Sequence, residues 1–214
     1  MSKQFFRLLA TTTFVILTVL VIAPAFKHPG TTSSHQPSTT ASTPSSQPTL
    51  DPAIQFTLSR VIDGDTIVAD ASDGAKQWLG QMSVPIQNSY TIRILGIDTP
   101  ELNKNKGIDP ACGAQDATDR LSQMIGLGEP VSLTFDPASA TTDRYNRLLA
   151  KVSTSIYSDI GSQLINEGLA SAWIPSSAKT PDGFATYQQQ TLVAKATSTG
   201  SWAKCPSVGR FTND

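Results

Sequence analysis

The sequence predicts an α+β fold with a mainly β core, in which five short strands form a small Greek-key barrel and about three α-helices pack on it. Two observations support this. Short runs rich in β-branched residues alternate polar with apolar positions, as half-buried strands do. Helical periodicity follows the third of these runs and returns near the end of the chain. This order of elements fits a barrel of the OB type.

The five strands are separated by residues that favour turns. Asp63-Gly64 separates the first two, and Asp98-Thr99-Pro100 ends the third. The stretch 70–89 contains Gly74, Gly80, Pro85 and Asn88 and is expected to be a long connection. The expected strands are residues 56–61, 66–69, 91–97, 131–135 and 147–152.

Three helices are expected from apolar periodicity. Asp109-Pro110 suits the start of the first, and Gly126 and Gly128 suit its end. The second ends at Gly168, and the third runs from about residue 184 to residue 200. Their expected core residues are Ala114, Ala117, Leu121, Met124, Ile125, Ile160, Leu164, Ile165, Tyr187, Leu192, Val193 and Ala196.

The chain divides into four parts by composition. Residues 1–26 place Lys3 and Arg7 before an apolar run, which indicates a cleaved signal peptide or a membrane anchor through residues 8–26. Residues 27–53 are rich in Ser, Thr and Pro, and indicate a flexible linker. A folded domain at 54–205 and a tail at 206–214 follow. Both readings of the first segment place the domain outside the cytoplasm, either secreted or on the outer face of the cytoplasmic membrane.

The histidine and cysteine content excludes several classes of site. Both histidines, His28 and His35, lie in the linker, so the domain has no Ser-His-Asp triad, histidine base or histidine-bound zinc. Cys112 and Cys205 are too few for a thiolate zinc site, and in an exported chain they predict one disulfide. Any metal must therefore be a hard cation bound by oxygen atoms, and calcium fits an extracellular site.

The charge of the expected domain is acidic. Of the 16 basic residues only Lys3, Arg7 and Lys27 precede position 50, whereas all 17 acidic residues follow it, which leaves a formal charge of −4 for residues 51–214. Proteins that bind nucleic acid through diffuse electrostatics are basic. A nucleic-acid site in this chain would therefore depend on a local positive potential.

Three short segments carry groups suited to a cation and a phosphate. Asp65 lies in one turn, and a second strand brings Arg93 and then a proline-fixed turn with Asp98 and Glu101. The segment 143–147 adds two guanidinium groups, whose planar fork matches phosphate. Each segment alone is typical of an ordinary turn, and their joint occurrence without histidine favours a functional site. Its catalytic side chains are expected to face solvent.

These segments resemble the signature blocks of the staphylococcal nuclease (thermonuclease-like) family. The blocks are residues 61–66, 93–101 and 142–150. The likeness continues through 164–170 and weakly to Trp202, so it covers roughly residues 54–205. Three separated blocks in the same order make the resemblance specific.

The resemblance implies a calcium-dependent nuclease that cuts DNA and RNA and leaves 3′-phosphate ends. Asp65, Asp98 and the Thr99 carbonyl would bind Ca²⁺. Glu101 would orient or deprotonate the attacking water. A monomer is expected.

The resemblance also assigns the arginines. Arg93 and Arg147 would bind the scissile phosphate and stabilise the transition state. Arg144 and Tyr145 would hold a terminal phosphate. The paired tyrosines that line the nucleoside pocket in the family are absent here, and Trp173 is the candidate for base stacking.

Two further points complete the expectations. Strand alternation alone puts Arg93 and Asp98 on opposite faces, so Gly96 would have to supply a bend. Asn146 replaces the family's glycine before Arg147, and asparagine tolerates a positive φ.

Two alternatives to a nuclease remain open at this stage. One is a nucleic-acid-binding OB module without catalysis, against which the full set of arginines and carboxylates counts. The other is a surface interaction domain on a stalk, which gives no reason for Arg93, Glu101 and Arg147.

Overall fold

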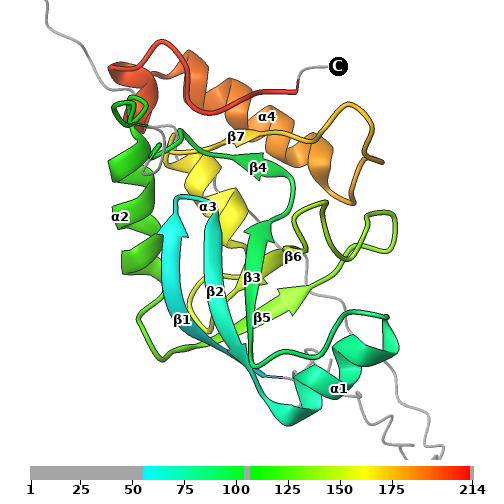
Figure 1. The fold of residues 1–214 in the computed structure, drawn as a ribbon. Helices are drawn as coiled ribbons and strands as arrows, with labels where there is room; N and C mark the ends of the chain where they lie inside the picture. The colour runs from blue at the N-terminus through cyan, green and yellow to red at the C-terminus, as the bar shows by residue number, and fades with distance from the viewer. Residues whose placement is uncertain (1–54, 104–106, 213–214) are drawn as a thin grey trace, which may run out of the picture. The chain divides into compact units, whose positions relative to one another are not determined.

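A computed structural model describes residues 55–103 and 107–212 of the chain. The predicted N-terminal signal or anchor and the predicted linker lie outside these residues. Figure 1 shows the arrangement of the elements. In chain order they are β1 (Phe56–Asp63), β2 (Thr66–Ala71), α1 (Asp73–Gln81), β3 (Ser89–Ile94), β4 (Ile97–Asp98), α2 (Ala114–Met124), β5 (Pro130–Thr134), β6 (Leu148–Ser153), α3 (Ile160–Asn166), β7 (Ser171–Ala172), α4 (Phe184–Ala196) and a 3-10 helix, η1 (Gly200–Ala203).

The predicted five-stranded barrel is confirmed. Its strands close in the order β1-β2-β3-β6-β5. All neighbours are antiparallel except β3 and β6, which run parallel with Arg93 opposite Leu149. A two-stranded sheet of β4 and β7 lies outside the barrel. The pairing of β3 with β6 places the segment that carries Arg93 beside the segment that carries Arg147.

The barrel interior is filled by aliphatic side chains. Along β6, buried and partly exposed residues alternate, so one side of the strand lines the core. Burying each large aliphatic side chain contributes about 1.5–3 kcal/mol relative to leaving it exposed. The fully buried members of this core include Ile67, Ile92, Leu148, Ala150 and Val152.

The expected third strand, residues 91–97, is wrong as one element. β3 stops at Ile94, and Gly96 adopts a φ of +82° before β4 begins. A Cβ atom at Gly96 would lie 3.2 Å from the Tyr187 ring, so glycine suits both the backbone angle and the space. The bend moves Asp98 off the line of β3.

The stretch 70–89 is not a plain connection, and this expectation is wrong. It contains the helix α1, capped by the Ser72 side chain, which accepts a hydrogen bond of 3.1 Å from the Ala75 N–H. Leu79 is fully buried, and the ring of Trp78 lies 5.3 Å from that of Phe135. The low helix propensity of Gly74 and Gly80 hides the helix in the sequence. The described residues therefore contain four α-helices, where about three were expected.

Two details of the expected helices are also wrong. α2 begins at Ala114 after Gly113, whose φ is +85°, and not at Asp109-Pro110. In α4, Leu192 and Val193 are exposed, as is Ala196. The inward face of α4 instead carries Phe184, Tyr187, Thr191 and Ala194.

The predicted disulfide is confirmed, with a Cα–Cα distance of 5.6 Å between Cys112 and Cys205. It ties the segment before α2 to the end of the chain. Residues 206–212 then run beside β7: Val208 is fully buried, and the Thr212 N–H donates to the Ala172 carbonyl at 2.9 Å. Among the described residues, no helix combines the length and apolar character needed to cross a membrane.

Candidate active site

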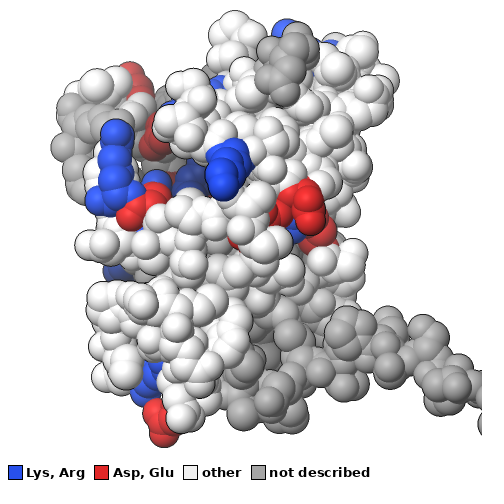
Figure 2. Space-filling view, turned by 90° about the vertical axis from the view of Figure 1, so that its right-hand side faces the viewer, with Lys and Arg blue, Asp and Glu red and all other residues white. Residues whose placement is uncertain are grey.

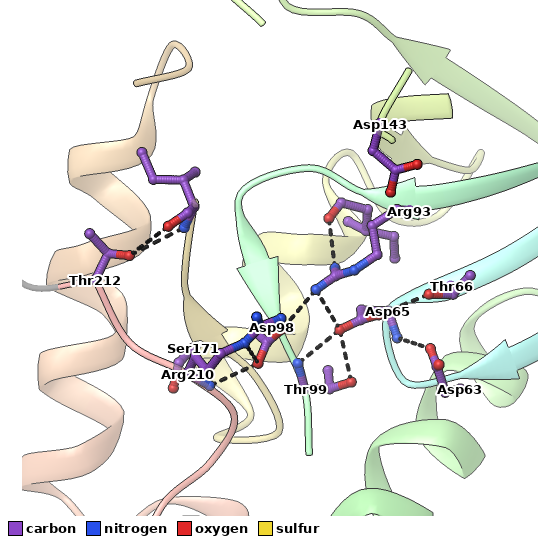
Figure 3. Close-up of polar contacts among 12 residues, drawn as sticks. Asp63, Asp65, Thr66, Arg93, Asp98, Thr99, Asp143, Ser171, Arg210 and Thr212 are labelled. Carbon is purple, nitrogen blue, oxygen red and sulfur yellow. Dashed lines mark hydrogen bonds and ion pairs between the residues drawn. The ribbon is translucent and has the colours of Figure 1, made fainter. Parts of the chain in front are cut away.

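The centre of the site is one arginine shared by two carboxylates. A single nitrogen of Arg93, Nη2, lies 2.8 Å from Asp98 Oδ1 and 3.0 Å from Asp65 Oδ2 (Figure 3). The other terminal nitrogen donates to the Ile94 carbonyl. All three side chains are buried, with exposed fractions below a tenth. The expectation that catalytic side chains face solvent is therefore wrong for Arg93.

Asp65 is fixed by the turn between β1 and β2 and by Thr99. Its Oδ2 accepts hydrogen bonds from the Thr99 N–H at 2.9 Å and the Thr99 hydroxyl at 3.1 Å, and its Oδ1 accepts one from Thr66 Oγ1. Gly64 makes this approach possible. A Cβ atom there would lie 2.8 Å from Thr99 Oγ1 and 2.7 Å from the Ala117 Cβ, inside contact distance.

Asp98 has a second arginine partner that sequence reasoning missed. Arg210 donates to Asp98 through its backbone N–H at 2.8 Å, through Nε at 3.1 Å and through Nη2 at 2.6 Å. The same guanidinium lies over the Trp173 ring, 3.5 Å from its centre. No pattern in the sequence points to Arg210, because it stands alone in a segment after the last helix and 112 positions from Asp98.

Burial dominates the electrostatics of Asp65. Loss of solvent raises its pKa from 3.8 to about 6, and Arg93 offsets only part of this effect. The negative charges of Asp63 and Asp98 add to the rise. The hydrogen bond to Asp98 raises the pKa of Arg210, so that guanidinium stays charged. The Asp65 carboxylate is thus incompletely neutralised by its neighbours, so further positive charge beside it would stabilise its ionised form.

Glu101 borders a cavity that also reaches Asp98. The cavity measures about 310 Å³, and its lining includes Asp98, Thr99, Glu101, Cys112 and Arg210. Glu101 is exposed to solvent. Figure 2 shows acidic and basic side chains close together around a hollow on one face, and not a uniformly basic surface.

Arg147 immediately precedes β6, the strand that pairs with β3, which carries Arg93. Because β3 and β6 run parallel with Arg93 opposite Leu149, Arg147, two residues before Leu149, is on the same side of the sheet as Arg93. Its Nε lies 2.7 Å from Asp143 Oδ2. Burial tends to raise the pKa of Asp143, but hydrogen bonds from Arg147 and from the Tyr145 N–H lower it overall.

The turn before Arg147 carries an exposed aromatic and cationic surface. Arg144 Nη2 donates to the Tyr145 hydroxyl at 2.8 Å, and its guanidinium lies 4.8 Å from the ring centre. Arg147 lies 5.5 Å from the same ring. Asn146 adopts a φ of +59°, so asparagine here does have the backbone angle that glycine supplies easily.

The donor atoms suit a hard divalent cation in kind. Asp65, Asp98 and the Thr99 carbonyl offer only oxygen, and Asp65 Oδ1 accepts a single hydrogen bond. No group of three or more acidic, histidine or cysteine side chains arranged for a metal occurs among the described residues. A cation would therefore depend on the two aspartates, a backbone carbonyl and water, and Asp98 already accepts hydrogen bonds from Arg93 and Arg210.

Comparison with known proteins agrees with this geometry. The family described as staphylococcal nuclease homologue matches residues 91–204. The chain is 33% identical over 116 residues to a thermonuclease of Staphylococcus hyicus, covering 54% of each protein. It is 24% identical over 159 residues to the endonuclease YhcR of Bacillus subtilis (strain 168), which is 72% of this chain and 12% of that enzyme.

These matches define the class of protein. The closed barrel, the Arg93 cluster and the family match over more than half of the chain agree with one another. The chain belongs to the family of staphylococcal nuclease homologues. It spans about half of the thermonuclease and about an eighth of the endonuclease.

Proposed function

We propose that this protein is a calcium-dependent nuclease that hydrolyses phosphodiester bonds in DNA and RNA and leaves 3′-phosphate ends. The observation that carries the proposal is the buried Arg93 shared by Asp65 and Asp98, with Glu101 bordering the adjoining cavity. Family membership and the two nuclease relatives support it.

Asp65, Asp98 and the Thr99 carbonyl would hold the calcium ion. When bound, the ion would supply positive charge to the phosphate oxygens of the substrate. Glu101 is exposed at the cavity beside these residues, where its carboxylate has access to water. Glu101 would orient an attacking water or accept its proton.

Arg93 and Arg147 would bind the scissile phosphate and stabilise the charge that develops on it. Their shared side of the sheet supports this pairing. Arginine is a poor proton donor at neutral pH because its pKa is above about 12, so water would protonate the leaving oxygen. Arg144 and Tyr145 would hold a terminal phosphate, and Trp173 would stack on a base.

We infer that the protein acts outside the cytoplasm, either secreted or tethered through residues 8–26, and as a monomer. The disulfide between Cys112 and Cys205 supports this location because structural disulfides persist in oxidising compartments. An acidic domain with a local arginine cluster suits a free enzyme that engages its substrate at one site.

The decisive experiment measures release of acid-soluble nucleotides from single-stranded DNA. We expect activity with calcium and its loss with EDTA. Glu101→Gln should lower the rate by a factor of about 10² or more, the scale of losing a proton-handling group. Glu129→Gln, at an exposed glutamate outside the cavity, is the matched control and should keep full activity.

Three results of this experiment would contradict parts of the proposal. Full activity in EDTA would exclude calcium as the cofactor. Binding of DNA without cleavage in all conditions would identify an inactive binding module. Loss of activity in Glu129→Gln equal to that of Glu101→Gln would remove Glu101 from the mechanism.

A further inference from the structure

The hydrogen-bonding capacity of Asp98 is filled by two arginines. A carboxylate offers about four acceptor positions. At Asp98, Oδ1 accepts from Arg93 Nη2 and Arg210 Nη2, and Oδ2 accepts from the backbone N–H and Nε of Arg210. A cation that binds Asp98 must therefore take the place of at least one of these donors.

We propose that the Arg210 side chain is the resident counter-ion of Asp98 and that a divalent cation must displace it to bind. The C-terminal segment 206–212 would then set the calcium concentration at which the site fills. This inference rests on the proposed function, because it concerns the calcium site named there.

Arg210 is the partner that can leave. Its side chain is 56% exposed, whereas that of Arg93 is 9% exposed and also donates to the Ile94 carbonyl. Water can replace the hydrogen bonds of an exposed guanidinium as it moves, and this lowers the free-energy cost of leaving. Removing Arg93 instead would leave Asp65 without the arginine that it contacts.

The backbone around Arg210 is held, so the side chain can move without the segment. Val208 is fully buried, and its carbonyl accepts a hydrogen bond from the Ser171 hydroxyl. Thr212 donates to the carbonyls of Ala172 and Ile174. These anchors flank Arg210 on both sides and keep it beside the cavity.

Trp173 can hold the Arg210 guanidinium after it has left Asp98. Its ring is already 3.5 Å from the Arg210 guanidinium, a cation–π contact that does not require Asp98. The side chain can thus give up the carboxylate and remain at the edge of the cavity, where a positive charge suits an anionic substrate.

The expected change in calcium affinity follows from competition between Arg210 and the cation for Asp98. The apparent dissociation constant for calcium rises by the reciprocal of the fraction of molecules in which Asp98 is free. An ion pair between a buried carboxylate and a largely exposed arginine is of moderate strength. We therefore expect removal of the Arg210 side chain to tighten calcium binding by about tenfold.

The test is a calorimetric titration of the full chain with calcium chloride. Arg210→Gln removes the charge and the fork and should lower the calcium dissociation constant by about tenfold. Lys204→Gln is the matched control, since it removes one positive charge from the same end of the chain but from an ion pair with Asp116, and it should leave the constant unchanged. The calcium dissociation constant of Arg210→Lys should lie between those of Arg210→Gln and Lys204→Gln.

Gly209→Ala is a second route that keeps the arginine. Gly209 has a φ of +64°, and a Cβ atom would lie 2.3 Å from the Asp98 carbonyl oxygen, so alanine should push the segment away from Asp98. If competition is correct, this variant also binds calcium more tightly. A rise in calcium-dependent melting temperature should accompany tighter binding in both variants.

Two results would overturn the inference. An unchanged or weaker calcium affinity in Arg210→Gln and Gly209→Ala would show that Arg210 does not oppose the cation. Equal tightening in Lys204→Gln would show a general charge effect. If neither the wild type nor any variant binds calcium, the proposed cofactor fails as well, and nuclease activity in EDTA distinguishes that failure from the first.

Discussion

Two arginine–carboxylate clusters in this domain differ in how charge is balanced. Arg120, on α2, pairs with Glu167 just after α3 through two hydrogen bonds of 2.6 and 2.7 Å. The hydrogen bonds from Arg120 lower the pKa of Glu167. At the site, Arg93 divides one nitrogen between two carboxylates, and burial raises the pKa of Asp65 to about 6.

The difference lies in how many buried carboxylates each arginine serves. One guanidinium for one half-buried carboxylate satisfies both groups, and the pair joins two helices. One guanidinium for two buried carboxylates leaves a need for further positive charge, and Arg210 supplies it mainly to Asp98, with which it forms hydrogen bonds. The same residue types therefore form a matched ion pair in one place and, in the other, a buried cluster in which one arginine is shared by two carboxylates.

The largest effect should separate the two arginines by function. Arg93→Ala should lower the nuclease rate by about 10² or more and destabilise the protein by about 3 kcal/mol, because it leaves the buried Asp65 without the arginine that it contacts. Arg120→Ala should cost about 1 kcal/mol, since Glu167 is partly exposed, and the rate per folded molecule should not change. Denaturant unfolding and the nucleotide-release assay measure both. Equal rates of nucleotide release in Arg93→Ala and Arg120→Ala would show that the two arginines do not differ in function.

Removing the disulfide should affect the site more than the helix pair. Changing both cysteines to serine releases a loop with a sequence separation of 93 residues and should lower stability by about 3 kcal/mol. The bridge lies next to the segment that carries Arg210, so calcium binding should change together with stability. Hydrogen exchange should rise in residues 206–212 and stay low at Arg120. Unchanged exchange in 206–212 would show that Val208 and Thr212 hold this segment without the bridge.

The two clusters should also differ in the sign of their pH dependence. The Asp65 carboxyl ionises near 3.8 in the unfolded chain and near 6 in the folded protein. Between these values the folded protein holds a proton that the unfolded chain has lost, so stability from this group falls as the pH rises. Glu167 behaves in the reverse way: its contribution is present above its ordinary value of 4.5 and is lost as the pH falls through its lowered pKa.

Melting curves without metal measure this contrast. Between pH 4 and pH 7, the free energy of unfolding of Asp65→Asn should rise by up to about 3 kcal/mol relative to wild type. Each unit of difference between the folded and unfolded pKa of Asp65 contributes about 1.4 kcal/mol. Relative to wild type, Glu167→Gln should lose stability as the pH rises from the lowered pKa of Glu167 to about 4.5, and the difference should stay constant at higher pH. The same sign in both variants would mean that the Asp65 carboxylate is as well neutralised as that of Glu167.

Local patterns were enough for much of the fold. Alternation located the five strands of the barrel, and helical spacing located the buried faces of α2 and α3. The count of two cysteines predicted the bridge. These features depend on neighbours in the chain, and short-range periodicity reports them directly. α1 was missed because its two glycines mask a helix that tertiary packing of Leu79 and Trp78 stabilises.

The sequence by itself determined which groups could form the site. The Asp65 turn, the segment from Arg93 to Glu101 and the Arg147 segment are each local, and their residue types limit the chemistry to oxygen-bound cations and phosphate. Only the tertiary structure decided how these groups meet. The Gly96 bend brings Asp98 to Arg93, burial raises the pKa of Asp65, and chain folding over 112 positions brings Arg210 to Asp98. Burial and long-range contacts depend on the whole packed chain, so no local pattern encodes them.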